Sequence, residues 1–387
     1  MSQPPTFRVA AASAAGAPAS PALPAGSTAS VVAAQRRSAE LEQQIATSPD
    51  GFRVLTGDRP TGPLHLGHYV GTLANRVRLQ AAGVEVFVVI ADYQVITDRD
   101  VAGDVRRNVR ELLLDYLAAG IVPRCGDRSA PDSKGATIFT HSAVPALNQL
   151  LLPLLSLVSV AELQRNPTVK AESAATGGRG MSGLLLTYPV HQAADILFCG
   201  ANVVPVGQDQ LPHLETARLV ARRFNDRYGA GRAVFAEPEA LLSAAPLLLG
   251  TDGAKMSKSA GNAIALRAGE DETARLIRSA KTDTERRITY DPVRRPEVAS
   301  LLLTAAVCAG STPEAVADKV GSGGAAALKR VATEAVNEHL RPLRNRRREL
   351  ADAGDYLRGV LRSGNEHANA VADRTLRTVQ EAMGMTY

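Results

Sequence analysis

The sequence predicts an α/β fold: a Rossmann-like, doubly wound parallel sheet followed by a C-terminal α-helical domain. Up to about residue 265, short apolar runs typical of buried parallel strands alternate with segments whose apolar residues recur at helical spacing. Beyond that point the strand signals disappear and charged helical patterns fill the chain. Because alternating strands and helices favour a parallel sheet, we expect an α/β domain at 51–265 and a helical domain at 266–387.

The expected elements of the α/β domain follow one another in a regular order. Strands are expected at 52–57, 84–92, 136–142 and 202–207. Helices are expected at 64–83, 104–120, 144–164 and 210–229. In the second domain, helical patterns occupy 326–354 and 368–384.

Composition excludes some classes of protein. The 387 residues carry a net charge of +5, from 44 basic and 39 acidic residues, which suits a polyanionic ligand without requiring one. No apolar run reaches the length of about 18 residues that a transmembrane helix needs, so we expect no membrane span. Cys125, Cys199 and Cys308 lie far apart and form no CxxC pair, which favours the reducing cytoplasm.

The first 50 residues differ from the rest of the chain. Alanine, proline, serine and glycine dominate the start of this stretch, and no acidic residue precedes Glu40. Such a segment buries too little apolar surface to offset its ordering entropy. We therefore expect a low-complexity, disordered extension at 1–50, and its acid-poor composition also resembles an organellar transit peptide.

The first chemical motif is "HLGH", in which His65, Gly67 and His68 follow an expected strand and open an expected helix. The first turn of a helix presents unpaired N–H groups and the positive end of the dipole, which together attract phosphate. Gly67 lets a base or sugar approach the backbone. The alternative is that the two histidines only cap or pack the helix.

The second motif is "GTDGAKMSKSAGNA" at 250–263. Only seven of the 44 basic residues are lysine, yet Lys255 and Lys258 both fall in this stretch. Lysine is a compact charge on a flexible stem, suited to following a phosphate, and the flanking glycines allow the loop to move. The alternative is a solvated basic loop on the surface.

A third stretch bears on the substrate. Tyr188, Gln192 and Asp195 are spaced i, i+4 and i+7, which places them on one face of a helix. Asp209 and Gln210 follow the strand at 202–207, and α/β folds bind ligands at the carboxyl ends of strands. An indole N–H is only a donor, so it needs an acceptor such as a carboxylate. The alternative is that Asp195 and Gln210 are structural hydrogen-bond partners in the core.

The HxGH motif followed by KMSKS resembles the signature pair of class I aminoacyl-tRNA synthetases, and the wording "TYPxxxAADIL…VPVGxDQ" is similar to the tryptophanyl-tRNA synthetase family. The similarity covers about residues 52–387. It implies ATP-dependent activation of L-tryptophan in the catalytic domain at 51–265, followed by transfer to tRNA(Trp). It further implies Mg²⁺ as a cofactor, a homodimer, and anticodon binding by the domain at 266–387.

The resemblance also implies how tryptophan is held. Asp195 would accept from the indole nitrogen, Tyr188 and Gln210 would hold the α-amino group, and Val204 and Val206 would line the ring slot. The remaining positions that match the family's tryptophan site are Leu55, Gln94 and Gln192.

Roles toward ATP carry over in the same way. Asp209 would contact the ribose, while Lys255 and Lys258 would bind the pyrophosphate side and act with His65 and His68 as the catalytic residues. The other positions expected to contact ATP are Arg59, Thr61, Gly67, Met256 and Ser257. We expect no protein side chain to be a metal ligand.

Some positions depart from the family pattern. Asp58 and Arg59 replace an aliphatic residue and Gln, and Gln94 and Gln192 stand where His and Met are usual. We expect the two glutamines to retain tryptophan while weakening inhibition by indole-like compounds. Three other interpretations remain: a tyrosyl-tRNA synthetase, a small-molecule nucleotidylyltransferase, and a regulatory paralogue that does not charge tRNA.

Overall fold

The computed structural model describes residues 29–97, 103–124, 135–175, 181–242, 247–257 and 261–387. At its centre lies a five-stranded sheet with the order β3-β2-β1-β4-β5, in which all neighbours are parallel. The strands are β1 (Arg53–Asp58), β2 (Glu85–Ile90), β3 (Thr137–Thr140), β4 (Val203–Val206) and β5 (Glu239–Leu242). The predicted fold class is confirmed, and the four expected strands correspond to β1–β4.

The sheet grows outward from β1 in both directions. The chain proceeds from β1 to β2 and β3 on one side, and then returns to place β4 and β5 on the other. Thr56 of β1 pairs in register with Val88 of β2, and Val54 pairs with Val203 of β4. A crevice forms outside the carboxyl ends of strands where the order reverses in this way.

Helices cover both faces of the sheet because side chains along each strand alternate between the faces. Val86, Val88 and Ile90 of β2 join the core beneath α4 (Val105–Ala119), whereas Phe87 and Val89 join the opposite core. The second core includes α9 (Gly183–Phe198) and α10 (Leu211–Tyr228). After β1 come α2 (Leu66–His68), a π-helical turn at Tyr69–Leu73, and α3 (Ala74–Ala81).

The edge strand β5 is covered by α1 (Ala29–Thr47). The Ser38 hydroxyl donates to the carbonyl of Ala240 and accepts from the N–H of Leu242. Arg37 forms a bidentate ion pair with Glu239, and Leu41 is buried among residues of β1, β4 and β5. An exposed edge strand invites pairing with another chain, and α1 prevents this on the β5 side.

This helix corrects the expectation of a disordered extension at 1–50, which is wrong for residues 29–47. Leu41 and Ile45 are each 1% exposed and lie one helical turn apart, so they provide the apolar surface that the composition seemed to lack. Residues 1–28, the rest of the predicted extension, lie outside the described part.

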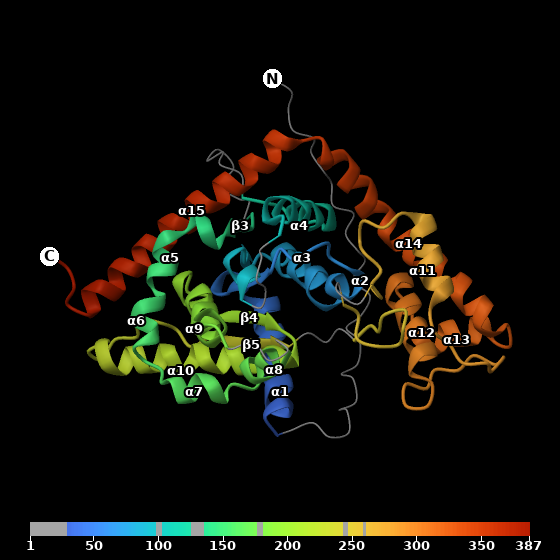
Figure 1. Ribbon diagram of the computed structural model, residues 1–387, viewed down its shortest axis with the longest axis horizontal. Helices are drawn as coiled ribbons and strands as arrows, with labels where there is room; N and C mark the ends of the chain where they lie inside the picture. The colour runs from blue at the N-terminus through green and yellow to red at the C-terminus, as the bar shows by residue number, and fades with distance from the viewer. Residues whose placement is uncertain (1–28, 98–102, 125–134, 176–180, 243–246, 258–260) are drawn as a thin grey trace.

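The other edge strand, β3, is covered by α15 (Gly354–Ala382), as Figure 1 shows. The Asn365 side chain accepts a hydrogen bond from the backbone N–H of Thr140. A Cβ atom on Gly364 would lie 1.9 Å from the carbonyl oxygen of Ile138, so only glycine permits this close approach. Both edges are therefore covered by helices from opposite ends of the described chain.

The remaining helices are α11 (Glu270–Ser279), α12 (Pro296–Ala309), α13 (Pro313–Val320) and α14 (Gly324–Ala351), which lie together in Figure 1. Their apolar residues join the core of α4 and β2, so the boundary predicted at 265 does not separate two cores. Arg347 of α14 forms ion pairs with Glu111 and Asp115 of α4. The arginines of α14 thus partly serve internal contacts.

Local structure differs from expectation in two other places. The helix expected at 144–164 is divided into α5 (Pro145–Gln149), α6 (Leu151–Leu155) and α7 (Val160–Arg165), and Ser159 caps the last of these with a capping box. Strand β5 was not expected. A further short helix, α8, spans Pro167–Ala175.

None of the described helices is by itself long and apolar enough to cross a membrane. The pair α12 and α13 passes the same test of length and composition, but the two helices meet at a bend of 107°.

Replacement of Leu41 by alanine should lower the free energy of unfolding by about 2–5 kcal/mol, because it leaves a cavity between α1 and the sheet. Val32→Ala on the same helix is the matched control, because Val32 is 38% exposed, and it should change stability by about 0.5 kcal/mol or less. Urea unfolding of the full chain checks both values. Equal small effects would show that α1 does not stabilise the sheet.

Candidate active site

The predicted functional residues gather at the carboxyl edge of the sheet. The loop after β1 leads to the HxGH turn, and β2 is followed by a 3-10 turn at Tyr93–Ile96. After β3 comes a second such turn, His141–Ala143, and after β4 a third, Gln208–Gln210. Because the strands are parallel, these connections meet at one edge, on both sides of the point where the strand order reverses.

The HxGH turn is held by reciprocal hydrogen bonds between its two histidines. The Nδ1 atom of His65 accepts from the backbone N–H of His68, and Nδ1 of His68 accepts from the N–H of His65, both at 3.3 Å. The two rings lie 3.6 Å apart. Both Nδ1 atoms act as acceptors here, which fixes the orientation of the two rings in the turn.

The two signature motifs are joined directly. Leu64 and Leu66, at the start of the HxGH turn, exchange backbone hydrogen bonds of 2.9 Å with Leu266 and Ile264, which follow the KMSKS stretch. Met256 is 6% exposed and belongs to the core of α4. A Cβ atom on Gly67 would lie 3.1 Å from Nδ1 of His65, a tight contact that glycine avoids, and 3.5 Å from the Met256 sulfur.

The lysine loop is organised by Asn262, a residue that the sequence analysis did not select. Asn262 is 3% exposed; its side chain accepts from the N–H of Ser257 and donates to Asp252 and to the carbonyl of Lys255. Lys255 itself is exposed. Lys258 lies outside the described residues. Asn262 could have been selected from the sequence because it lies within the quoted stretch at 250–263. It directly precedes the segment that pairs with the HxGH turn.

Asp58, at the end of β1, belongs to a polar cluster beneath the HxGH turn. Its carboxylate lies 2.6 Å from the guanidinium of Arg76 and accepts from the Tyr116 hydroxyl at 2.7 Å. Arg76 is 2% exposed and lies over the Tyr116 ring. Burial favours the neutral acid, but the Arg76 charge outweighs it and holds the pKa of Asp58 well below its usual range. Asp58, which departs from the family pattern, therefore has an ion-pair partner, Arg76, on α3.

Asp195 lies in the interior of α9, 2% exposed, as its helical spacing predicted. Its Oδ1 atom lies 2.9 Å from Nε2 of His141, which is fully buried and directly follows β3. Burial favours neutral imidazole, but the Asp195 carboxylate outweighs this and raises the pKa of His141. The sequence analysis missed His141, although its place directly after an expected strand was visible.

Tyr188 lies on α9 as expected, in a small cluster with Val169 and Leu185. Its hydroxyl lies 3.2 Å from Nε2 of His213. Burial lowers the pKa of His213 to about 4, so this imidazole is neutral at pH 7. Burial and the nearby Glu172 carboxylate raise the pKa of Tyr188.

The other predicted residues fall into two groups. Leu55, Val204 and Val206 are each no more than 6% exposed and belong to the core between the sheet and α9. Gln94, Gln192, Arg59 and Thr61 are half-buried near the carboxyl edge, as is Gln210, whose side chain donates to the exposed Asp209. Tyr188 is not part of the core that holds the three apolar residues.

The chemistry of the site suits a nucleotide. The glycine at 67 leaves a space that a Cβ atom would fill, the two histidines face it, and Lys255 and Arg59 supply positive charge. Among the described residues, the one group of three candidate metal ligands is His141, His191 and Asp195, all buried. His141 and Asp195 already form an ion pair with each other, and we assign no metal there.

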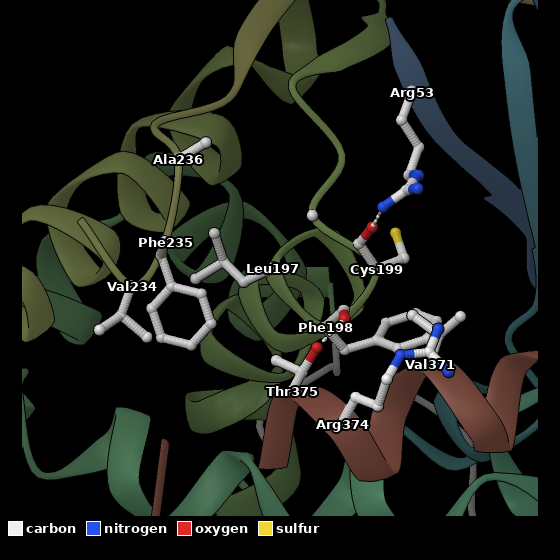
Figure 2. A pocket seen from close by; sticks show the side chains of 11 residues that line it. Arg53, Leu197, Phe198, Cys199, Val234, Phe235, Ala236, Val371, Arg374 and Thr375 are labelled. Atoms are coloured by element: carbon white, nitrogen blue, oxygen red, sulfur yellow. Dashed lines mark hydrogen bonds between the residues drawn. The ribbon is translucent and has the colours of Figure 1, made fainter. Parts of the chain in front are cut away.

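A separate cavity of about 200 Å³ lies near the amino end of β1, away from this edge (Figure 2). Arg53, Arg374 and Phe235 are among the residues that line it. Arg53 donates to the carbonyl of Cys199 at 2.6 Å, and Thr375 donates to that of Phe198 at 2.6 Å. None of the predicted site residues lines this cavity.

The chain is similar in sequence to a known family of proteins. A family model described as tRNA synthetases class I (W and Y) matches residues 48–341. The tryptophan–tRNA ligase of Treponema pallidum is 42% identical over 87% of this chain and 97% of its own length. That of Clostridium longisporum is 40% identical over 86% and 97%.

Solved structures agree with the sequence relatives. The crystal structure of tryptophanyl-tRNA synthetase from Campylobacter jejuni complexed with ADP and tryptophan matches with a TM-score of 0.72 and 29% identity. The match covers 86% of this chain and all of that one. Helix α1 precedes the region that the family model matches.

Arg76→Met should lower the free energy of unfolding at pH 7 by about 3–5 kcal/mol, because Asp58 would keep a buried charge without a partner. The lowered pKa of Asp58 means that its contribution to wild-type stability is present above the usual carboxyl pKa and is lost as pH falls. The deficit of the variant should therefore shrink as pH falls from about 5 to 3, through the usual carboxyl pKa of about 3.9.

The double variant Asp58→Asn, Arg76→Met is the control, since it removes both charges and should recover part of the loss. Chemical unfolding across this pH range checks the prediction. A deficit that does not change with pH and is not relieved by Asp58→Asn would contradict the ion pair.

Proposed function

Because the chain belongs to the class I tRNA synthetases of the tryptophan and tyrosine type, we propose that it activates L-tryptophan with ATP and transfers it to tRNA(Trp). The observation that carries this proposal is the backbone pairing that joins the HxGH turn to the KMSKS segment at the carboxyl edge of the sheet. The relatives at 40–42% identity are tryptophan–tRNA ligases, which favours tryptophan over tyrosine.

In the first step the tryptophan carboxylate attacks the α-phosphorus of ATP in line. The bond to the bridging oxygen breaks, pyrophosphate leaves, and tryptophanyl-AMP forms. A carboxylate is already a nucleophile, so this step needs no general base. The protein has to position both substrates and offset the negative charge that grows on the leaving group.

The two motifs divide this work. His65 and His68 meet the phosphates from the HxGH turn, and the ribose contacts Asp209. Lys255 is exposed, has its carbonyl held by Asn262, and binds the pyrophosphate side. The motif assigns the same role to Lys258. Mg²⁺ would enter with ATP and offset part of its negative charge, and no protein side chain is assigned to hold it. Flexible ammonium groups tighten as charge develops, which raises the rate rather than ground-state affinity alone.

The amino acid is held on the other side of the switch point. Asp195 accepts from the indole N–H, and Tyr188 and Gln210 hold the α-amino group. Leu55, Val204 and Val206 form the apolar slot, and Gln94 and Gln192 complete the pocket. Since Asp195 is 2% exposed, a substrate without a donor at that point leaves the second oxygen of a buried carboxylate without a hydrogen bond and is rejected.

In the second step the terminal 2′-hydroxyl of tRNA(Trp) attacks the acyl carbon and AMP leaves. We assign tRNA contact to the helices after residue 265, and a homodimer in the cytoplasm to the working enzyme. Arg344 and Arg347 are not the candidates for RNA contact, because they bind Thr273 and Asp115 within the protein.

Charging of transcribed tRNA(Trp) with labelled tryptophan tests the function as a whole. We expect tryptophan to be attached to tRNA(Trp), and neither tyrosine nor tRNA(Tyr) to be used. Normal formation of tryptophanyl-AMP without charging would identify a regulatory paralogue, and charging of tRNA(Tyr) with tyrosine would reverse the choice of amino acid.

Lys255→Ala should reduce kcat for ATP–pyrophosphate exchange by about 100-fold or more while changing tryptophan affinity little, because the ammonium acts mainly in the transition state. Lys319→Ala is the matched control, since this lysine lies on α13, outside the site. Exchange kinetics and tryptophan titration separate the two effects. An equal loss in rate and affinity would contradict the assigned role.

A further inference from the structure

We propose that His141 is a positioning residue for tryptophan recognition, which fixes Asp195 in the ionised, oriented form that accepts the indole N–H. The inference rests on the proposed function, since it concerns the same pocket. It adds a residue that neither the motifs nor the family resemblance had selected.

The first observation is the contact itself. The Nε2 atom of His141 lies 2.9 Å from Oδ1 of Asp195, and the two side chains are 0% and 3% exposed. The contact is an ion pair by distance, and the two atoms do not meet hydrogen-bond geometry. A buried carboxylate needs such a partner to remain charged, because burial alone favours the neutral acid. His141 thus stabilises the charge and occupies one oxygen, which leaves Oδ2 for the ligand.

The second observation is that the histidine is itself fixed in place. Asn148 of α5 donates to the carbonyls of His141 and Val144, so its amide oxygen must face His191, 2.9 Å from Nε2. His191 therefore donates from Nε2, and burial lowers its pKa, so it is neutral. The centroid of its ring lies 4.6 Å from that of His141, and the Asp195 charge acts on both rings.

The other side of His141 is closed by the loop after β2. The ring of Tyr93 stacks on His141 with a centroid distance of 6.5 Å. The Asp92 carboxylate is bonded by the backbone N–H and hydroxyl of Ser142, and its charge adds to that of Asp195 in raising the pKa of His141. The charged and titratable groups that face His141 are therefore Asp195 and His191 of α9, together with Asp92.

The consequence is selectivity for a ring that carries an N–H group. Binding of any substrate removes water from the Asp195 carboxylate, which costs free energy. A substrate without the N–H donor forms no hydrogen bond that offsets this cost. Without His141, the carboxyl group could take up a proton or rotate, and the difference between such substrates would shrink.

The experiment compares tryptophan with β-(3-benzothienyl)alanine, an isostere in which sulfur replaces the indole N–H. ATP–pyrophosphate exchange gives kcat and KM for each substrate in wild type, His141→Phe and His141→Gln. Phenylalanine keeps the stacking surface for Tyr93 without a donor, whereas glutamine restores a neutral donor. His367→Phe on α15 is the matched control, since this half-buried histidine lies beside Phe87, away from the carboxyl edge.

In His141→Phe we expect KM for tryptophan to rise about 10- to 100-fold, while kcat and the KM for the isostere change much less. His141→Gln should recover part of the loss, and His367→Phe should behave as wild type.

An equal rise in KM for both substrates, with no recovery in His141→Gln, would overturn the inference, because it would show that His141 only shapes the pocket. If tryptophan supports no exchange in wild type while another amino acid does, the proposed function fails and this inference fails with it. If wild type uses tryptophan and His141→Phe discriminates between tryptophan and the isostere as well as wild type does, only the role of His141 is overturned.

Discussion

The reversal of strand order at β1 is the constraint on which the rest of the molecule depends. Because β2 and β4 both pair with β1 in parallel, the turns that follow these three strands meet at one edge of the sheet, where α/β folds bind ligands. The sheet thereby brings together chain segments more than 140 residues apart. At the amino ends of β1 and β4, for example, the backbone N–H of Arg53 donates to the side chain of Asn202. The two edges of this sheet are covered by α1 and α15, so the strands are held in a single arrangement.

Buried charges on the two sides of β1 follow the same design. Asp58 is paired with Arg76 beneath the phosphate-facing turn, and Asp195 is paired with His141 beneath the expected indole site. In each case a carboxylate near the crevice is held by a buried cation that does not itself line the nucleotide turn. Each pair costs desolvation but fixes a charge at a defined position, which a substrate site requires and an apolar core cannot supply.

Sequence patterns predicted the elements with strong local signals. The apolar run before Ala91 could only be a buried strand, and the i, i+4, i+7 spacing of Tyr188, Gln192 and Asp195 placed them on α9. Strand β5 was missed because Glu239–Leu242 is short and carries no β-branched residue. The partnerships of Asp58 with Arg76 and of Asp195 with His141 were not predictable, since each joins residues on different elements that only the sheet brings together.

The central claim is that one crevice at the carboxyl ends of β1 and β4 holds both substrates, and a crystal structure with tryptophan and a non-hydrolysable ATP analogue tests it most directly. The account predicts the indole nitrogen within hydrogen-bond distance of Asp195, and the triphosphate between the HxGH turn and Lys255. Tryptophan or nucleotide bound instead in the cavity beside Arg53 and Arg374, with the carboxyl edge empty, would contradict it.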